Sequence, residues 1–225
     1  MSDAASLAPR RILLVDDHPI VRQGLRRMIA NERDLEVCGE AETVREARQA
    51  VRDLAPDVVV VDLSLREGDG IELVRELRAH HPDLPVLVLS MHDESVFAGR
   101  LLAAGARGYI MKQAASEQFI AAVRCVLAGG TYTSQAIGAS TTTGREPGGQ
   151  GPVAGLSNRE LQILQMLGRG LSSRQVAEAL HLSIKTVEAH RQRIKGKLDL
   201  KTSAQLVQFA VNWVAGARRP PSPVA

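Results

Sequence analysis

The sequence contains few cysteines and no long apolar run. Its only cysteines, Cys38 and Cys125, are far apart and show no spacing typical of metal ligands, so we expect two buried, reduced thiols. No segment approaches the roughly 18 consecutive apolar residues of a membrane span. Residues 1–9 contain no apolar run of signal-peptide length. These absences predict a cytoplasmic protein that does not engage a membrane.

Charge is unevenly distributed, although the net charge of the chain is only +3. Residues 10–130 contain 16 Lys and Arg and 19 Asp and Glu, a net charge of −3. Residues 151–225 contain 11 Lys and Arg and 4 Asp and Glu, a net charge of +7. This contrast indicates two modules with different partners. The basic module could bind a polyanion, most commonly nucleic acid, or could carry charge only for solubility.

Apolar runs alternate with amphipathic stretches through the first part of the chain. The run at 58–61 consists of four valines, which suits a parallel strand that is covered on both faces. Five strand–helix units in order predict an α/β doubly wound, five-stranded parallel sheet of the flavodoxin-like type. In such a fold, ligands bind at the carboxyl ends of the strands. We expect strands at 11–15, 35–39, 58–61, 86–89 and 108–111, and helices at 20–30, 44–54, 71–77, 96–104 and 117–127.

The composition changes after this domain. Of the 19 residues at 136–154, 11 are Gly, Pro, Ser or Thr, which predicts a flexible linker. Four short helical segments follow, without strands, and they predict a small all-α helix-turn-helix domain. Capping signals precede them at Ser157, Ser172, Ser183 and Thr202. The predicted division is a disordered N-terminus at 1–9, a first domain at 10–131, a linker at 132–154, a second domain at 155–216 and a disordered tail at 217–225.

Three carboxylates follow the predicted strands. Asp16 and Asp17 come directly after the first strand and Asp62 after the third, and these strand ends lie side by side in the expected topology. Carboxylates that lie so close together repel one another, and a hard cation such as Mg²⁺ relieves the repulsion. The fourth strand ends at Ser90, and Lys112 follows the fifth. The set predicts a phosphoryl site, although each residue alone would be read as a turn residue or a solvated charge.

These residues resemble the receiver domain of two-component response regulators over about residues 10–130. The loop after Asp62 departs from the family pattern because it has no proline. The matching segments are Leu14-Val-Asp-Asp-His-Pro19, Val61-Asp-Leu-Ser-Leu65 followed by Gly70, Ser90, and Tyr109-Ile-Met-Lys112.

The resemblance implies a role for each matched residue. Asp62 would take a phosphoryl group from the phosphohistidine of a sensor histidine kinase. Asp17, Asp62 and the backbone carbonyl of Ser64 would ligate Mg²⁺, with Asp16 acting through water. Lys112 would pair with the phosphoryl group. Ser90 would swing toward that group and Tyr109 would follow inward, which would change the packing of a partner surface.

Residues 176–180 and 183–198 form a predicted helix-turn-helix. On the second helix, Val187, Ile194 and Leu198 share one face by the 3.6-residue period and are expected to pack inward. From helix geometry alone, the opposite face could be an ordinary solvated surface. The alternative is a DNA-binding face, which would contain Lys185, Thr186, Glu188, Ala189, Arg191, Gln192, Arg193, Lys195 and Lys197.

The second domain resembles the LuxR-type DNA-binding domain over about residues 155–215. The resemblance implies four helices, of which the third enters the major groove. Glu188 stands where some members carry a base-contacting lysine, so it could accept a hydrogen bond from cytosine N4 or orient Arg191 or Lys185. The matching segments are Leu156-Ser-Asn-Arg-Glu160, Gly170-Leu-Ser-Ser-Arg-Gln-Val-Ala177, Ser183-Ile-Lys-Thr-Val-Glu-Ala-His190 and Ile194-Lys-Gly-Lys-Leu198.

The fourth helix of this domain carries an apolar stripe that a domain of this size cannot fully cover. The resemblance implies homodimerisation through this helix, and hence binding to paired half-sites. The dimer face would contain Leu206, Phe209, Ala210 and Trp213. The alternative is that Trp213 packs on its own domain.

The order of the two domains is similar to that of the NarL/FixJ family of transcriptional regulators. This similarity implies a regulator that is not an enzyme, apart from its own phosphoryl transfer and dephosphorylation. Its partners would be double-stranded promoter DNA, a sensor histidine kinase, RNA polymerase and, when phosphorylated, a second copy of the chain. Two other hypotheses stay open: a Mg²⁺-dependent phosphohydrolase, and a regulator that binds DNA constitutively and has an idle receiver.

Overall fold

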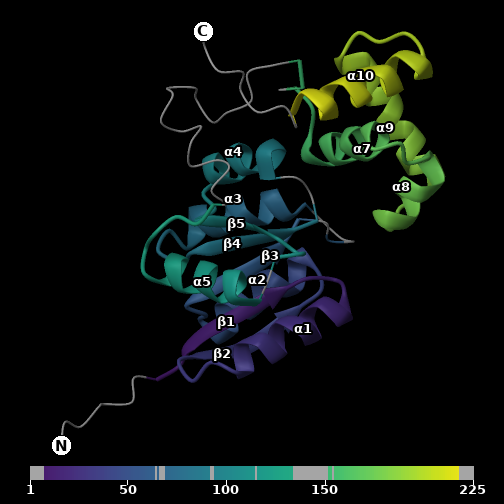
Figure 1. Ribbon diagram of the computed structural model, residues 1–225. Coiled ribbons are helices and arrows are strands. Elements are labelled where there is room, and N and C mark those ends of the chain that lie inside the picture. The colour runs from purple at the N-terminus through teal and green to yellow at the C-terminus, as the bar shows by residue number, and fades with distance from the viewer. Residues whose placement is uncertain are drawn as a thin grey trace, which may run out of the picture. The chain divides into compact units, whose positions relative to one another are not determined.

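The computed structural model describes residues 8–63, 65, 69–91, 94–114, 116–133, 152–153 and 155–217. The chain forms two compact units, Met1–Pro147 and Gly148–Ala225 (Figure 1). This division falls inside the predicted linker, most of which lies outside the described residues. The flexibility of the linker and the disorder of both termini therefore stay predictions.

The first unit contains a five-stranded parallel sheet with the strand order β2-β1-β3-β4-β5. The predicted alternation of strands and helices is confirmed, with boundaries that differ by a few residues. The strands are β1 (Arg10–Val15), β2 (Leu35–Ala41), β3 (Val58–Asp62), β4 (Val86–Ser90) and β5 (Gly108–Met111). The helices are α1 (Pro19–Ala30), α2 (Val44–Leu54), α3 (Gly70–His80), α4 (Glu94–Ala104) and α5 (Ser116–Leu127).

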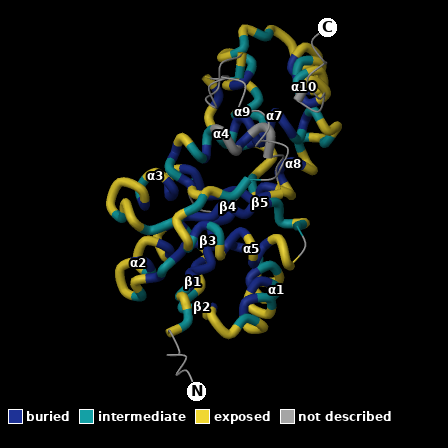
Figure 2. The backbone as a smooth tube through the Cα atoms, turned by 60° about the vertical axis from the view of Figure 1, so that its left-hand side comes forward, coloured by how far each residue is buried: buried dark blue, intermediate teal, exposed yellow. Residues whose placement is uncertain are grey.

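The apolar strands are covered on both faces, as Figure 2 shows by the dark blue of the central strands. Alternate residues of β1 and β3, such as Leu14 and Val60, pack in one core cluster with Ile29 of α1 and Val123 of α5. The side chains between them point to the opposite face, where α2 and α3 contact β1 and β3. Because both faces are buried, every residue of β3 is buried, which explains its run of valines.

The chain returns to the edge of the sheet after α5. Tyr132 forms an isolated parallel bridge with Gly108. The Tyr109 N–H donates to the Tyr132 carbonyl at 2.9 Å, and the Tyr132 N–H donates to the Arg107 carbonyl at 3.0 Å. A Cβ atom on Gly108 would lie 3.0 Å from the Tyr132 carbonyl oxygen, so glycine permits this close approach. The predicted linker thus begins with a residue that is bonded to the sheet.

The second unit is helical and contains α7 (Asn158–Gly168), α8 (Ser173–Ala179), α9 (Ile184–Lys197) and α10 (Ser203–Ala217). The capping boxes predicted at Ser157 and Ser172 are confirmed, and Ser183 caps α9. The turn between α8 and α9 passes through His181 at a φ of 51°. Within the described ranges, no helix is both long and apolar enough to cross a membrane.

Helices α7 and α10 approach each other closely at Gly168. A Cβ atom there would lie 2.4 Å from the Ala210 carbonyl oxygen and 2.6 Å from a methyl group of Val214. Because a backbone oxygen cannot move aside as a flexible side chain can, this contact requires glycine. Leu206 and Ala210 of α10 are fully buried in the same interface.

We expect Gly168→Val to lower the free energy of unfolding of the second unit by about 2 kcal/mol, since the added methyl groups would push α7 and α10 apart. The only tryptophan of the chain is Trp213 in α10, so tryptophan fluorescence during urea unfolding reports on this unit. Gly216→Ala is the control, because no atom lies within 4 Å of its Cβ position. Equal stability of Gly168→Val and the wild type would contradict this account of the interface.

Candidate functional site

Three aspartates come together at the carboxyl edge of the sheet. Asp16 and Asp17 follow β1, and Asp62 is the last residue of β3. The two strands are neighbours, with Val15 opposite Val61, so the residues at their carboxyl ends lie close together. All three carboxylates are at least 96% buried. Burial removes the water that would screen their mutual repulsion, so the cluster requires positive charge.

Lys112 supplies one such charge. It follows β5, and its Nζ lies 2.6 Å from Asp16 Oδ2 and 2.9 Å from Asp62 Oδ2. Burial by itself would lower the pKa of Lys112, but the charges of Asp62 and Asp16 and the hydrogen bonds to them outweigh it, so the pKa is raised. The ammonium is therefore held in its charged form against the acceptor predicted for the phosphoryl group.

His18 also belongs to this cluster, although the sequence analysis assigned it no role. Its Nδ1 lies 2.9 Å from Asp16 Oδ1 and 2.7 Å from Asp17 Oδ1. The ligand atoms of Asp16, Asp17, His18 and Asp62 all lie within 4.8 Å of one another. Such a group of carboxylates could hold a divalent cation. The position of His18 directly after the two aspartates was the available signal.

Arg22 is a second residue that the sequence analysis missed. It is a buried residue of α1, and its Nη1 donates to the Asp16 carbonyl at 2.5 Å. Its other nitrogens pair with Glu40 at 2.8 Å and Glu42 at 2.5 Å. This arginine fixes the backbone that carries the first aspartate of the site. In the sequence, it appeared only as a cation on an amphipathic helix.

The other predicted receiver residues lie where the topology should place them. Ser90 ends β4 and is fully buried, and Tyr109 in β5 is 1% exposed. The Lys112 N–H donates to the Ser90 carbonyl at 2.8 Å. A Cβ atom on Gly70 would lie 2.6 Å from the Asp62 carbonyl, so the start of α3 packs tightly on the acceptor strand. Ser64, the predicted carbonyl ligand, lies outside the described residues.

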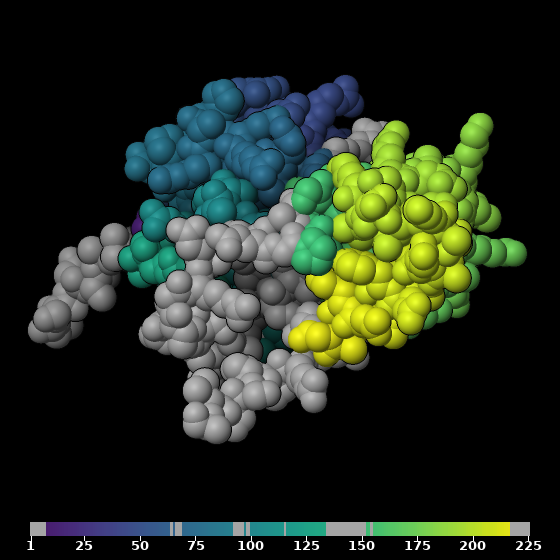
Figure 3. All heavy atoms as spheres, turned by 90° about the horizontal axis from the view of Figure 1, so that it is seen from above, coloured from purple at the N-terminus to yellow at the C-terminus, as the bar shows by residue number. Residues whose placement is uncertain are grey.

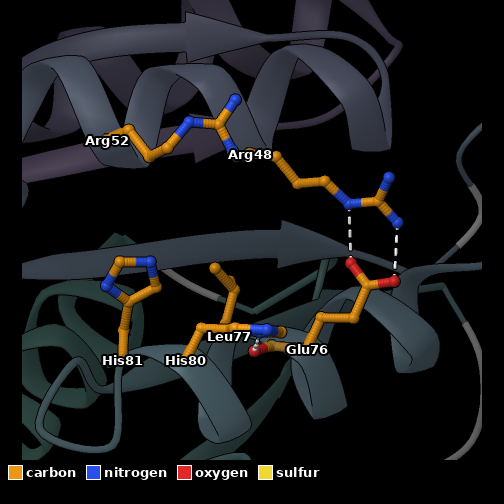
Figure 4. A pocket seen from close by; sticks show the side chains of 6 residues that line it. All are labelled: Arg48, Arg52, Glu76, Leu77, His80 and His81. Carbon is orange, nitrogen blue, oxygen red and sulfur yellow. Dashed lines mark hydrogen bonds and ion pairs between the residues drawn. The ribbon is translucent and has the colours of Figure 1, made fainter.

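A pocket of about 340 Å³ lies between α2 and α3 (Figure 4). On one side of it, Arg48 of α2 forms two hydrogen bonds of 2.6 Å with the carboxylate of Glu76 of α3. Its lining is completed by Arg52, Leu77, His80 and His81 and includes none of the site aspartates. This pocket therefore offers no substrate space next to the carboxylates.

Comparisons with known proteins agree with this architecture. Residues 12–124 match the family described as response regulator receiver domain, and residues 154–210 match the luxR family of bacterial regulatory proteins. The oxygen regulatory protein NreC of Staphylococcus carnosus (strain TM300) is 37% identical over 209 residues, which cover 89% of this chain and 96% of that protein.

The chain belongs to the response regulator family. It is a DNA-binding response regulator of the NarL/FixJ type from a two-component system, an architecture of regulators rather than of enzymes.

Solved structures show the same fold. A LuxR-family response regulator from Aurantimonas sp. SI85-9A1 is 38% identical, with a TM-score of 0.57, and the match covers 61% of this chain and 99% of that one. RcsB from Salmonella enterica serovar Typhimurium, solved on a promoter with phosphomimetic BeF3−, is 25% identical. Its TM-score is 0.61, and the match covers 90% of this chain and 98% of that chain.

The helix predicted to enter the major groove is α9 (Ile184–Lys197). Val187 and Ile194 are fully buried in the LuxR-type unit, as predicted from their spacing. On the rest of the helix, Lys185, Ala189, Gln192, Arg193 and Lys197 are exposed, and Thr186, Glu188, Arg191 and Lys195 are half-buried. The predicted DNA-binding residues therefore reach the surface to different degrees.

Two cations of α9 have partners inside the domain. Lys197 Nζ lies 2.7 Å from Oε2 of Glu160, a buried residue of α7. Arg191 Nη1 lies 3.0 Å from Glu188 Oε1 and 2.5 Å from the hydroxyl of Ser173 on α8. Both cations belong to the predicted DNA-binding face, and these internal contacts compete with a role in binding DNA.

The predicted dimer face on α10 needs a correction. Leu206 and Ala210 are fully buried, since they pack against α7 of their own domain. Phe209 and Trp213 are half-buried. Val207 and Val211 are 39% and 44% exposed. Helix α10 is yellow in Figure 3. The surface that it can offer to a partner includes these two valines and excludes Leu206 and Ala210.

We expect Arg22→Ala to lower the free energy of unfolding of the receiver unit by about 2 kcal/mol, because the Asp16 carbonyl and two carboxylates lose their cation. Far-UV circular dichroism during urea unfolding measures the change. Arg26→Ala is the matched control: Arg26 also pairs with Glu40, at 3.3 Å, but its side chain is 63% exposed, so its loss should cost less than about 0.5 kcal/mol. Equal losses for the two variants would refute the supporting role of Arg22.

The pair of Glu160 and Lys197 predicts a pH dependence for the LuxR-type unit. Burial raises the pKa of Glu160, but bonds from Lys197 and Ser157 outweigh it, so the pKa lies below the ordinary value of 4.5. A lowered folded-state pKa stabilises the fold above the ordinary pKa, and this stabilisation is lost as the pH falls through the folded-state value. Lys197→Met should therefore cost about 1 kcal/mol at pH 7 and progressively less in acid.

Trp213 fluorescence during urea unfolding at several pH values measures this effect. Lys201→Met provides the control, since Lys201 is exposed and its ammonium makes no ion pair with any described residue. If the loss of unfolding free energy in Lys197→Met stayed constant down to pH 3, the pair with Glu160 would be excluded as its source.

Proposed function

We propose that this response regulator is a phosphorylation-controlled transcription factor of the cytoplasm, in which Asp62 accepts a phosphoryl group from a sensor histidine kinase. The observation that carries the proposal is the position of Asp62. Its carboxylate is 99% buried at the end of β3, and Oδ2 lies 2.9 Å from Lys112 Nζ. A carboxylate next to a fixed cation is suited to bind a group that brings three anionic oxygens.

In the proposed reaction, a carboxylate oxygen of Asp62 attacks phosphorus. The new P–O bond forms as the bond between phosphorus and the kinase histidine nitrogen breaks, and the nitrogen keeps the electron pair. Lys112 lies next to the accepting oxygen and compensates the incoming charge. Hydrolysis of the resulting acyl phosphate would restore Asp62, and these two steps are the only catalysis that we propose.

Asp16, Asp17 and Asp62 fit a Mg²⁺ ion, because hard cations prefer carboxylate oxygens and the ligand atoms of the cluster lie within 4.8 Å. The Ser64 carbonyl would complete the protein ligands. When bound, the cation supplies positive charge that neutralises the phosphoryl oxygens. Asp17 and Asp62 would ligate it directly, and Asp16 would act through water.

Ser90 and Tyr109 would transmit the change. Ser90 ends the strand next to β3, where its hydroxyl can meet a phosphoryl oxygen. Tyr109 lies in β5, the strand that leads to Lys112 and is bonded to Tyr132. A shift of Lys112 and Ser90 toward the phosphoryl group would therefore repack the β4–β5 region and the chain that leaves the receiver.

The output would be binding of α9 to promoter DNA by a homodimer. The apolar side chains that α10 exposes, Val207 and Val211 beside Phe209 and Trp213, support pairing of two copies. RcsB has been solved bound to a promoter in the presence of a phosphomimetic, which supports binding of promoter DNA by a phosphorylated form here. RNA polymerase would be the further partner at the promoter.

DNA binding to sites selected from random sequence tests the phospho-switch. With acetyl phosphate and Mg²⁺, we expect wild-type affinity to rise at least severalfold, because phosphorylation pairs the DNA-binding domains. Asp62→Asn, which lacks the accepting oxygen, should not respond. The spacing between half-sites in the selected DNA reports whether two copies bind.

The alternatives predict different outcomes of this experiment. Equal affinity of the wild type and Asp62→Asn with and without donor would overturn the switch and favour constitutive binding. Multiple turnover of a small phosphomonoester by the purified protein would favour a phosphohydrolase instead.

A further inference from the structure

The carboxylate of Glu188 is held by two other side chains on α9 and the helix before it. Its Oε1 accepts hydrogen bonds from the hydroxyl of Ser173 at 2.5 Å and from Arg191 Nη1 at 3.0 Å. Arg191 Nη1 also donates to the Ser173 hydroxyl at 2.5 Å. Each of these three side chains from α8 and α9 thus contacts the other two. Both hydrogen bonds to Glu188 are accepted by Oε1.

Exposure decides which member of this set faces outward. The side chain of Glu188 is 46% exposed, whereas that of Arg191 is only 15% exposed. Because the Arg191 side chain is so far buried and its Nη1 is already bonded to Ser173 and Glu188, it is less well placed than an exposed cation to bind a phosphate. The carboxylate is the more exposed group, and its second oxygen, Oε2, takes no part in these bonds and can meet a ligand. Arg191 therefore orients Glu188, rather than the reverse.

We propose that Glu188 reads the exocyclic amino group of a cytosine in the major groove, and that Arg191 and Ser173 are positioning residues for it. This inference rests on the proposed placement of α9 in the major groove. A carboxylate can only accept hydrogen bonds there, and cytosine N4 is the donor that it matches. Among the described residues, Lys185, the other cation that could have been its partner, forms no hydrogen bond or ion pair with Glu188.

Arg191 and Ser173 reduce two free-energy costs of placing the Glu188 carboxylate next to DNA. A free carboxylate is repelled by the phosphates, and the adjacent guanidinium compensates its charge. A side chain that becomes ordered only on binding also loses rotamer freedom. With Oε1 already bonded to two groups, Glu188 has a fixed conformation before DNA arrives. The arrangement predicts a sharp preference at one base pair in each half-site.

The experiment measures base preference with the full-length regulator, with acetyl phosphate and Mg²⁺, by competition among single-base variants of the selected site. The wild type should prefer C·G at one position by about tenfold. Glu188→Gln should lose that preference and gain one for A·T at the same position, because glutamine pairs with adenine N6 and N7. Arg191→Met should weaken the cytosine preference severalfold and leave the other positions unchanged.

A matched control is available on the neighbouring helix. Glu178 of α8 also pairs with an arginine, Arg174, at 3.2 Å, but its side chain is 66% exposed and it lies outside α9. Glu178→Gln should leave the preference at every position unchanged. Unchanged Trp213 fluorescence and thermal unfolding of Glu188→Gln would confirm that its altered preference does not come from a damaged fold.

Two results would overturn the inference. The first is an unchanged cytosine preference in Glu188→Gln. The second is a uniform loss of affinity in Arg191→Met with a salt dependence that is lower by about one phosphate contact, since Arg191 would then bind the backbone. Both differ from failure of the proposed function, in which the wild type itself would bind no site above the level of non-specific DNA.

Discussion

Repulsion among Asp16, Asp17 and Asp62 is the constraint that organises the first unit. Three carboxylates with almost no exposed surface need nearby donors and positive charge. Lys112 after β5 supplies a positive charge to Asp62, and Nδ1 of His18 lies 2.7 Å from Asp17 Oδ1. The strand order β2-β1-β3-β4-β5 brings these residues to one edge. The sheet therefore forms the hydrophobic core and also places opposite charges next to each other.

In the second unit, two carboxylates are each paired with a cation of α9. Glu160 is buried and takes its cation, Lys197, from α9. Glu188 is half-buried and pairs with Arg191, which lies one helical turn further along α9. The first pair joins α7 to α9, whereas the second joins α9 to α8 through Ser173. Two of the cations in the basic part of the sequence are thus committed to the architecture of the domain, and fewer are left for phosphates.

Much of the fold was predictable from the sequence because each signal is local. The run of valines in β3 and the 3.6-residue spacing of Val187 and Ile194 are each visible within a few residues of sequence, and the structure confirms both predictions. The capping boxes at Ser157 and Ser172 depend on residues three positions apart, and they are also present. Strand order then brought the predicted aspartates together.

What the sequence did not reveal depends on contacts between distant segments. Arg22 meets Glu40 and Glu42 only because α1 packs beside β2. The burial of Leu206 and Ala210 follows from the close approach of α10 to Gly168, which has no local signature. An amphipathic pattern shows that a helix has an apolar side. It does not show which apolar residues remain exposed after the helix has packed.

The contact between Lys112 and the aspartates has a thermodynamic consequence. The aspartates and Lys112 meet only when β1, β3 and β5 are all in place, so the unfolded chain has no equivalent site. A cation or phosphoryl group that binds there stabilises the whole sheet by an amount set by its concentration relative to its dissociation constant. The melting temperature of the receiver unit, followed against ligand concentration, therefore reports the binding of its ligands.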